Sequence, residues 1–402
     1  MKVLVFPHHL ELGGSQVNAI DLAASLRDIY GHQVVIFATP GPALELVNAR
    51  GMRFIAAPRP KAHPSPTVMW ALRRAVRDER VDLVHAWDWP QCLDAFYGIY
   101  LGGGVPLVGS NMSMEVTRFL PRSIPLTYGT PALVEAARRA RRGPVVLLEP
   151  PVDTERNSMA AVDPTQFRQR HGLDDGRPTL VIVSRLVAWM KLEGILRSME
   201  AVALLGQERA VRLVVVGGGT AYDRLNARAA ELNRLVGSRV VVLTGPMTDP
   251  RPAYAAADIV LGMGSSILRG MAFAKPCLVL GEENFSEPLN PETSPRFLNG
   301  GFFGLGDRSA TPHLLYTQLK ELLGNDNRLR QLGAFSRRIV EERFSLPVGA
   351  RTLDELYRQT VGYSVSRSDV VLDGVRSGLL RIASGAIPKR PRRHIVNGGL
   401  RG

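Results

Sequence analysis

The chain has 402 residues, of which 45% are apolar, and it carries a formal net charge of +13 and two cysteines, Cys92 and Cys277. That length is too great for one compact core and fits two domains plus a tail. No apolar run reaches the roughly 18 residues that a membrane-spanning helix needs, and the apolar stretch at the start is too short for a signal peptide. The sequence therefore predicts a cytoplasmic protein with reduced, structural thiols.

The excess of positive charge is clustered along the chain. Fifty basic residues face 37 acidic ones, and basic residues crowd at 73–77, 138–142 and 389–393. The electrostatic field of such positive clusters attracts nucleic acid, anionic lipid or phosphorylated ligands alike. Because no helix-turn-helix, zinc-finger or RNA-binding motif is present, we expect no nucleic-acid partner. Two interpretations stay open: peripheral contact with the inner face of an anionic membrane through 73–77 or 389–393, and a bias toward arginine that has no function.

Short apolar runs alternate with longer amphipathic stretches from the first residue to about residue 345. Residues 15–26 and 67–78 carry apolar side chains at helical spacing. Strands that alternate with helices predict a parallel sheet with crossover helices. The strands predicted in the first part of the chain are 3–6, 33–37, 54–56, 83–85 and 107–109.

The pattern pauses near residue 150 and then restarts. Residues 145–148 read as a strand and 149–153 as a proline-containing linker. Two consecutive α/β units of similar length predict two Rossmann-like domains facing each other, over 1–150 and 151–345. Beyond a predicted helix, residues 364–402 lose periodicity and read as a basic, mobile tail. The strands predicted in the second unit are 180–183, 213–216, 240–243 and 277–280.

Eight short phrases occur in a fixed order along the chain. They are GGSQ at 13–16, DLVHAWD at 82–88, PVD at 151–153, SRL at 184–186 followed by a lysine at 191, VVVGGG at 214–219, LTG at 243–245, AAADIV at 255–260 and GMAFAKP at 270–276. In this order the phrases resemble the family 4 glycosyltransferases, over residues 1 to about 360.

The resemblance implies a fold and a reaction. The fold is of the GT-B type, an α/β architecture with two Rossmann-like domains facing across a cleft and a crossover helix at 346–363 that returns to the first domain. The reaction is the retaining, metal-independent transfer of a sugar from a nucleotide-diphosphate sugar to a hydroxyl acceptor, which could be a glycan, a glycolipid or a secondary metabolite. No cofactor is implied beyond the nucleotide-sugar co-substrate.

Arg185 and Lys191 follow a predicted strand end, where open α/β sheets bind ligands. Arginine grips phosphate as a planar fork, and lysine acts as a flexible point charge. The resemblance assigns this pair the catalytic task of stabilising the leaving diphosphate, which such a pair can do without a metal. No Asp-x-Asp pair follows a strand, so no metal site is predicted. Two solvated cations at a strand end are the alternative interpretation.

The turn at Gly13 and Gly14 precedes a predicted helix. Glycine permits close backbone approach, and the N-terminus of the helix offers N–H groups to an anion. The resemblance places Gly13 and Gly14 beside the donor phosphates, and Gly14 and Ser15 on the acceptor side. A plain strand-to-helix turn is the alternative.

A second cradle opens at Gly264, Ser265 and Ser266, ahead of another predicted helix. Two hydroxyl side chains at a helix N-terminus suit a phosphate or a ribose better than they suit packing. Gly217, in the glycine run after another strand, is the remaining glycine that we expect on the donor side.

His85 ends a predicted strand. In the family a histidine of this phrase contacts the transferring sugar, and a second histidine often follows, where this chain has Trp87. The alternative for His85 is a hydrogen-bonded histidine at a strand end. Trp87 either stacks on the acceptor or packs in the core, and Asp88 either orients a sugar hydroxyl or caps the next helix.

The sharpest departure from the family is the loss of two glutamates, eight positions apart, whose places are taken by Leu261 and Arg269. A carboxylate that accepts hydrogen bonds from ribose hydroxyls cannot be replaced by arginine without rewiring. In the loop 281–287, Glu282, Glu283 or Glu287 could supply it, with Glu283 our candidate, or these charges are only solvated. The departure also leaves open a non-catalytic descendant that binds a nucleotide-sugar or a partner, and an epimerase-like or hydrolytic relative.

Overall fold

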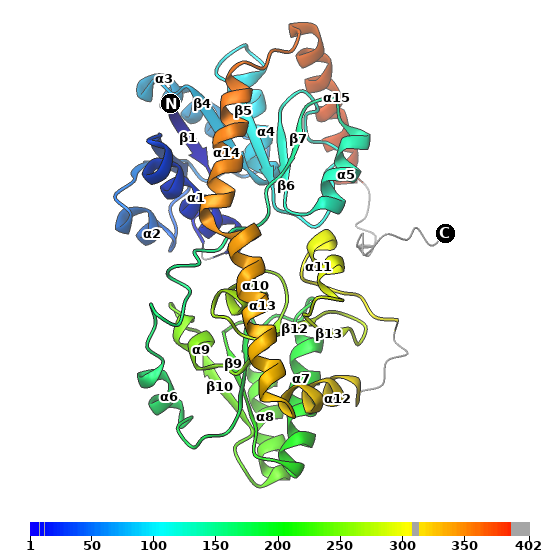
Figure 1. Cartoon of the computed structure of the whole chain (residues 1–402). Helices are drawn as coiled ribbons and strands as arrows, with labels where there is room; N and C mark the ends of the chain where they lie inside the picture. Colours follow the sequence, from blue (N-terminus) through cyan, green and yellow to red (C-terminus); the bar gives the residue numbers. More distant parts are fainter. Residues whose placement is uncertain (8, 12, 308–312, 387–402) are drawn as a thin grey trace. The chain divides into compact units, whose positions relative to one another are not determined.

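The computed structural model describes residues 1–7, 9–11, 13–307 and 313–386. The chain divides into two compact units (Figure 1). Unit 1 comprises Met1–Pro151 and the chain from Leu346 onward, and unit 2 comprises Val152–Ser345. The division falls one residue from the predicted linker boundary, and the last predicted helix belongs to unit 1.

Unit 1 is built on a seven-stranded sheet in the order β3-β2-β1-β4-β5-β6-β7, with every neighbouring pair parallel. Its strands are β1 (Lys2–Phe6), β2 (Gln33–Ala38), β3 (Arg53–Ala56), β4 (Leu83–Trp87), β5 (Leu107–Asn111), β6 (Leu126–Tyr128) and β7 (Val145–Leu147). Its helices are α1 (Gly14–Tyr30), α2 (Leu44–Ala49), α3 (Pro66–Glu79), α4 (Asp88–Ala95) with its π-helical continuation η1 (Phe96–Tyr100), α5 (Pro131–Ala140), α14 (Leu346–Val361) and α15 (Arg367–Ala386).

Helices bury both faces of this sheet. Val3 and Val5 of β1 belong to one core cluster with α1 and α14, whereas Leu4 and Phe6 belong to another with α3, η1, α5 and α15. Alternate residues of a strand point to opposite faces, so a strand covered on both sides is apolar throughout. This is why the sequence shows continuous apolar runs here instead of an alternating pattern.

Unit 2 holds a six-stranded sheet in the order β10-β9-β8-β11-β12-β13, parallel except for the antiparallel edge strand β13. Its strands are β8 (Thr179–Val183), β9 (Arg212–Val216), β10 (Val241–Gly245), β11 (Ile259–Gly262), β12 (Cys277–Leu280) and β13 (Ser286–Pro288). Its helices are α6 (Thr165–His171), α7 (Leu192–Glu208), α8 (Tyr222–Val236), α9 (Arg251–Ala256), α10 (Ser265–Ala272), α11 (Ser294–Gly300), α12 (His313–Leu323) and α13 (Asp326–Phe344). The prediction of two α/β, Rossmann-like domains is confirmed.

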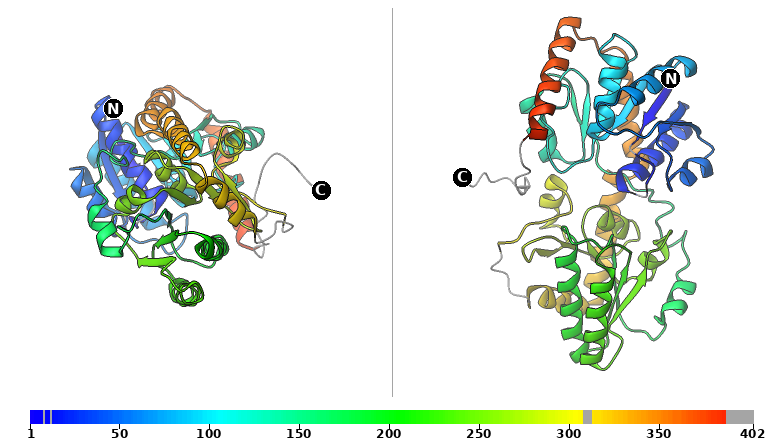
Figure 2. Two further views of the ribbon diagram at one scale, coloured as in Figure 1. Left: turned by 60° about the horizontal axis from the view of Figure 1, so that its bottom comes forward. Right: turned by 180° about the vertical axis from the view of Figure 1, so that it is seen from behind.

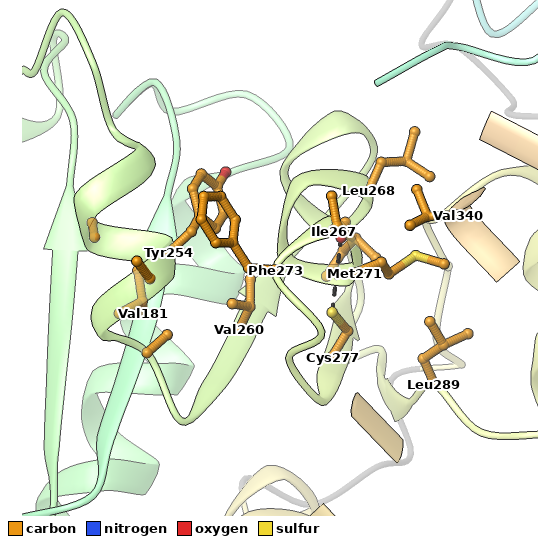
Figure 3. Close-up of a cluster of buried hydrophobic side chains, with 14 of the residues drawn as sticks. Val181, Tyr254, Val260, Ile267, Leu268, Met271, Phe273, Cys277, Leu289 and Val340 are labelled. Carbon is orange, nitrogen blue, oxygen red and sulfur yellow. Dashed lines mark hydrogen bonds between the residues drawn. The ribbon is translucent and has the colours of Figure 1, made fainter. Parts of the chain in front are cut away.

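The core of unit 2 fixes the position of α10 (Figure 3). Ile267, Leu268 and Met271 are buried on its inner side within the main core cluster. Just beyond the helix, the ring of Phe273 stacks on that of Tyr254, with centroids 5.9 Å apart. Core packing therefore holds helix α10 in place. This matters because its first residues are candidates for donor binding.

For residues 367–386 the structure corrects the prediction of a mobile tail over 364–402. Arg367–Ala386 forms helix α15, which is tied to unit 1 by side-chain hydrogen bonds. The segment does carry apolar residues at helical spacing, but its high content of Arg, Ser and Gly was interpreted as the composition of a tail. The basic cluster at 389–393 lies outside the described residues.

Two findings bear on membranes and metals. None of the helices in the described part of the chain combines the length and the hydropathy needed to cross a bilayer. In the same part of the chain, no three His, Cys, Asp or Glu side chains come together as a metal site would require. Cys92 and Cys277 are both buried and unpaired.

Candidate functional site

Each sheet has one point at which the order of its strands reverses. In unit 1 this point lies between β1 and β4, and in unit 2 between β8 and β11. The loops that leave the carboxyl ends of two such strands diverge, and the crevice between them is where open α/β sheets bind ligands. The predicted loops at 13–15 and 88 follow β1 and β4, while those at 185–191 and 264–266 follow β8 and β11. The fold therefore brings most of the predicted residues to these two points.

In unit 1 the switch point is held together by Asp88. Its carboxylate accepts a hydrogen bond from Ser15 Oγ at 2.8 Å and one from the backbone N–H of Met112 at 3.2 Å. Asp88 has a positive φ of 64°, a conformation that costs energy for a residue other than glycine unless the surroundings impose it. Asp88 thus joins the loops after β1, β4 and β5.

The first turn of α1 lies beside this junction. Helix α1 starts at Gly14 after an extended Gly13, and among the described residues no side chain caps its N-terminus. The first N–H groups of an uncapped helix have no intrahelical partner and favour an anion. Gly14 is exposed, and Ser15 is partly exposed while its hydroxyl binds Asp88.

His85 corrects the prediction of a sugar-contacting histidine. The ring is buried in unit 1, where Nδ1 hydrogen-bonds Tyr357 Oη at 2.6 Å and Nε2 hydrogen-bonds Ser110 Oγ at 2.7 Å. Burial lowers the pKa of His85 to about 3, so the ring is neutral near pH 7. With both nitrogens occupied, His85 joins β4, β5 and α14 and offers nothing to a sugar.

Trp87 corrects the prediction of an acceptor-stacking tryptophan. Its side chain is almost completely buried in the core cluster with α1 and α14. The ring packs beside that of His85, with centroids 5.0 Å apart. An acceptor has no access to it in unit 1, so Trp87 is a core residue.

A histidine–aspartate pair that the sequence did not reveal lies near the same edge of the unit 1 sheet. His63 Nδ1 lies 2.8 Å from Asp94 Oδ2, and Oδ1 of this fully buried carboxylate accepts the N–H of Ser65 at 2.6 Å. His63 lines a small pocket with Thr39 and Gln91 and with residues that follow β1 and β3. The two partners are 31 positions apart, so only the fold shows that they pair.

In unit 2 the loop after β8 presents two cations without a counter-ion. Arg185 is exposed and Lys191 is partly buried, and in the described part of the chain neither side chain has a hydrogen-bond or ion-pair partner. Burial, and secondarily the charge of Arg185, lower the pKa of Lys191 to about 8. Both residues lie in the loop between β8 and α7, and the positive charge of Arg185 reaches Lys191. An anion placed between them would relieve both the repulsion and the desolvation.

Gly217 contributes by shaping this loop. Its φ is +151°, and a Cβ atom at this position would overlap the carbonyl oxygen of Ser184. Because the backbones of 184–186 and 216–218 approach closely here, Ser184 N–H bonds Val216 O at 3.0 Å and Leu186 N–H bonds Gly218 O at 2.9 Å. Gly217 therefore positions the loop that carries Arg185, and this explains why glycine is needed there.

At the neighbouring strand, Gly264 adopts a positive φ of 60° and leads into α10. Ser265 is exposed, whereas Ser266 Oγ accepts a hydrogen bond from Tyr254 Oη at 3.3 Å. No side chain in the described residues caps the N-terminus of α10. The arrangement leaves Ser265 and the first helical N–H groups for a phosphate or hydroxyl.

The two positions that lack the family's glutamates differ in their surroundings. Leu261 is fully buried in β11. Arg269 is partly exposed on α10, and its charge acts on the buried Tyr254 hydroxyl, partly offsetting the rise in the pKa of Tyr254 that burial causes. Neither position can accept a hydrogen bond from a ribose, because leucine has no polar atom and arginine only donates.

The loop after β12 is tied to the start of α7. Glu193, two residues after Lys191, accepts the N–H groups of Asn284 at 2.7 Å and Glu283 at 3.1 Å. Glu283 and Asn284 both have positive φ, so the loop is tightly turned. Glu287 is instead ion-paired with Arg296 at 2.9 Å on edge strand β13. The sequence did not identify Glu193, because its partners are about 90 positions away.

Two family models match the chain and together cover more than half of it. The Glycosyltransferase Family 4 model matches residues 12–142, and the Glycosyl transferases group 1 model matches residues 177–296. No curated protein sequence matches the chain.

Solved structures match almost the whole fold. A glycosyltransferase from Rickettsia africae has a TM-score of 0.72 at 17% identity, covering 90% of this chain and 99% of its own. Anabaena Alr3699/HepE, solved with UDP, with UDP and glucose and with UDP-glucose, has a TM-score of 0.68 at 16% identity, covering 89% and 100%. The MnaA–UDP structure from S. aureus has a TM-score of 0.58 at 13% identity, covering 91% and 99%. At these identities the likeness concerns the fold, and it confirms the predicted GT-B type.

Proposed function

Because this chain belongs to the family 4 glycosyltransferases, we propose that it moves a sugar from a UDP-sugar donor to a hydroxyl acceptor, with retention of configuration and without a metal ion. One observation carries the proposal: Arg185 and Lys191 both lie in the loop after β8 at the switch point of unit 2, and neither has a counter-ion among the described residues. A nucleoside diphosphate supplies the missing negative charge. Uridine is proposed as the nucleoside because Alr3699/HepE has been solved with UDP and with UDP-glucose.

The cation pair has its main effect in the transition state. As the bond between the sugar C1 and the β-phosphate oxygen breaks, negative charge grows on the leaving diphosphate. Arg185 and Lys191 stabilise that charge from fixed positions, so little reorganisation is needed when it develops. The acceptor oxygen forms the new bond to C1, and its proton passes to the departing phosphate. The cations thus supply the positive charge that a metal would otherwise bring.

The rest of the donor site is proposed from neighbouring loops. The N-terminus of α10, with Gly264, Ser265 and Ser266, binds phosphate oxygens. Glu283 is our candidate for the ribose hydroxyls, since its loop is tied to the start of α7 two residues after Lys191. It would take over the task that the absent glutamates perform elsewhere in the family.

The acceptor side is proposed on unit 1. Asp88 orients the first turn of α1 through Ser15, so the acceptor meets Gly14, Ser15 and the uncapped N–H groups. His63, oriented by Asp94, adds a ring edge beside the same strand ends. Because Asp94 lies against Nδ1, the ring can present Nε2 to an acceptor hydroxyl.

A thermal-shift panel with UDP, GDP, ADP and dTDP, run with and without EDTA, tests the donor. A ligand that binds only the folded state stabilises it by about 2.7 kcal/mol at a hundredfold excess over its dissociation constant. We expect UDP to raise the melting temperature, EDTA to leave the shift unchanged, and Arg185→Ala to abolish it. Arg224→Ala, at an exposed arginine of α8, is the matched control and should keep the shift.

Two results would contradict the proposal. A shift with another nucleotide alone would overturn the choice of uridine, and a UDP shift that survives Arg185→Ala would overturn the role of the cation pair. The anomeric configuration of the product, read by NMR from the sugar C1–H coupling, tests retention separately.

A further inference from the structure

Helix α15 exposes its apolar side chains. Five aliphatic residues with helical spacing are largely exposed along one side of the helix, and we call them the α15 stripe. They are Val371, Leu372 (67% exposed), Val375, Leu379 (64%) and Ile382 (73%). Seen from behind, the helix lies at the surface of unit 1 (Figure 2, right). Isolated exposed leucines are ordinary, but a row of five on one helix marks a surface that meets something apolar.

The side chains on the opposite side of α15 are small and polar, and these are the ones that pack against the rest of unit 1. Asp373 accepts hydrogen bonds from Ser123 N–H at 2.7 Å and Ser123 Oγ at 2.8 Å. Tyr97 Oη donates to Gly374 O at 2.7 Å, and Ser377 Oγ donates to Phe119 O at 2.5 Å. A helix fixed in this way is already anchored by its polar face. Its aliphatic face is therefore left over for a second partner.

The charge of the sequence that follows the start of the stripe selects the partner. From Gly374 to residue 402 the sequence has seven basic residues and no acidic one. Two of them, Arg376 and Arg381, lie on α15, where Arg376 is 3.6 Å from Asp373, and the other five fall outside the described residues. A second copy of the chain docked on the stripe would bring two such segments together, and their like charges would repel. A surface rich in anionic lipid neutralises the same charges and accepts aliphatic side chains among its acyl chains. We propose that α15 lies in the interface of an anionic membrane, with the stripe inserted into the lipid.

Helix α3 adds an interfacial feature on the same side of the unit 1 sheet. Both helices contribute to one core cluster with η1 between them, since Met69 of α3 packs on Gly98 and Gly374 of α15 accepts from Tyr97. Trp70 of α3 is 65% exposed, and Arg73, Arg74 and Arg77 are exposed at positions three, four and seven residues further on. Exposed tryptophan and arginine are typical of the membrane–water boundary.

The arginines of both described basic clusters also make contacts within unit 1. Arg138 donates to Val145 O at 3.0 Å and Arg141 to Ile124 O at 2.9 Å. On α3, Arg73 donates to Gly98 O, and Arg74 Nε lies 3.3 Å from Asp78 Oδ2. The α3 cluster is assigned to the membrane because the exposed Trp70 stands on the same helix.

Co-sedimentation of the full chain with lipid vesicles tests the proposal. Vesicles of phosphatidylcholine alone are compared with vesicles containing roughly one third phosphatidylglycerol. We expect binding to the anionic vesicles only, weakened by added salt. The double variant Leu372→Ser with Leu379→Ser should lower the partition coefficient on the order of tenfold or more, since it removes aliphatic carbons that would enter the lipid.

A matched control and a folding control accompany the variant. Leu235 of α8 is 63% exposed on unit 2, and Leu235→Ser should bind vesicles as the original chain does. The melting temperature and its shift with UDP should be unchanged in the double variant, because the substituted side chains are exposed. That readout separates this proposal from the donor proposal, which stands or falls on the shift itself.

Other occupants of the stripe would give different results. A dimer in light scattering that the double variant dissociates, with no vesicle binding, would overturn the proposal in favour of a second copy. Equal vesicle binding by the original chain and the double variant would overturn the role of the stripe. Reversal of charge with Arg390→Glu and Arg393→Glu should weaken binding to anionic vesicles, and unchanged binding would overturn the electrostatic part.

Discussion

The side chains at the two switch points differ in whether they have partners. In unit 1 the polar side chains of this region bind one another: Asp88 binds Ser15, and His85 lies between Tyr357 and Ser110. In unit 2 Arg185 and Lys191 share the loop after β8 with no partner in the described part of the chain, and the pKa of Lys191 is lowered to about 8. A region whose groups are already paired is a scaffold. A region that keeps unpaired like charges is stabilised only when its ligand arrives.

The largest expected effect comes from removing the buried charge of unit 2. Because the pKa of Lys191 in the folded chain lies below its ordinary value of 10.5, the folded state resists protonation, and the charged lysine at pH 7 lowers stability. Lys191 also stands at the N-terminus of α7, where the helix dipole disfavours a cation. We expect Lys191→Met to lower kcat/KM by about 10²–10³, as the loss of a group that stabilises transition-state charge does, while raising the melting temperature.

Activity assays and calorimetry on the same preparation check this opposition between function and stability. Lys320→Met is the matched control, since Lys320 is an exposed lysine of unit 2 paired with Glu208. It should change the free energy of unfolding by no more than about 0.5 kcal/mol and leave activity intact. A lower melting temperature for Lys191→Met would show that the Lys191 charge is already stabilised in the free protein. The difference between the two switch points would then disappear.

The second-largest effect is expected for His85→Ala, which tests whether His85 stabilises the fold of unit 1 without taking part in catalysis. His85→Ala leaves Tyr357 Oη and Ser110 Oγ without their histidine partner and opens a cavity beside Trp87. We expect the free energy of unfolding to fall by about 2–3 kcal/mol, because buried polar groups that lose a partner are costly. The kcat of the folded fraction should stay within about twofold, since the ring reaches no substrate.

Urea unfolding and steady-state kinetics below the unfolding temperature separate the two quantities. Val108→Ala, a truncation in neighbouring strand β5 at a fully buried apolar site, shows what cavity formation alone does to both readouts. A large fall in kcat at unchanged stability would return His85 to the catalytic set.

The same contrast explains what the sequence could and could not reveal. Most of the parallel strands were predictable because helices cover both faces and make each strand a continuous apolar run. Strand β11 was not predicted, although it is buried throughout and begins Ile-Val-Leu. Strand β6 has only three residues and β13 reads Ser-Glu-Pro, so neither carries that signal. Helix α15 does carry apolar residues at helical spacing, but the Arg, Ser and Gly among them gave the segment the composition of a tail; the sequence also could not show that these apolar residues face outward.

Among the site residues, those defined by local phrases were easier to identify than those defined by pairing. Arg185 and Lys191 stand in one short segment whose order along the chain is enough to single them out. The pairing of His63 with Asp94, and of Glu193 with the backbone at 283–284, joins positions far apart in sequence. His85 was misjudged because its phrase shows that it ends a strand and does not show that Tyr357, 272 positions later, closes over it.

The smallest expected effect, and the sharpest test of the open charge in unit 2, is the pH dependence of UDP binding. In the free protein Lys191 has a pKa of about 8, and a bound diphosphate raises it because the charged form gains a partner. The dissociation constant should be flat below pH 8 and rise by up to about tenfold per pH unit above it, where binding must first return a proton to Lys191. Calorimetric titrations in buffers of different ionisation enthalpy should show that proton uptake directly.

Lys191→Arg keeps the charge at every pH in this range, so its dissociation constant for UDP should not rise above pH 8. A rise that persists in Lys191→Arg would assign the titrating group to another residue, and the lowered pKa of Lys191 would then have no part in donor binding.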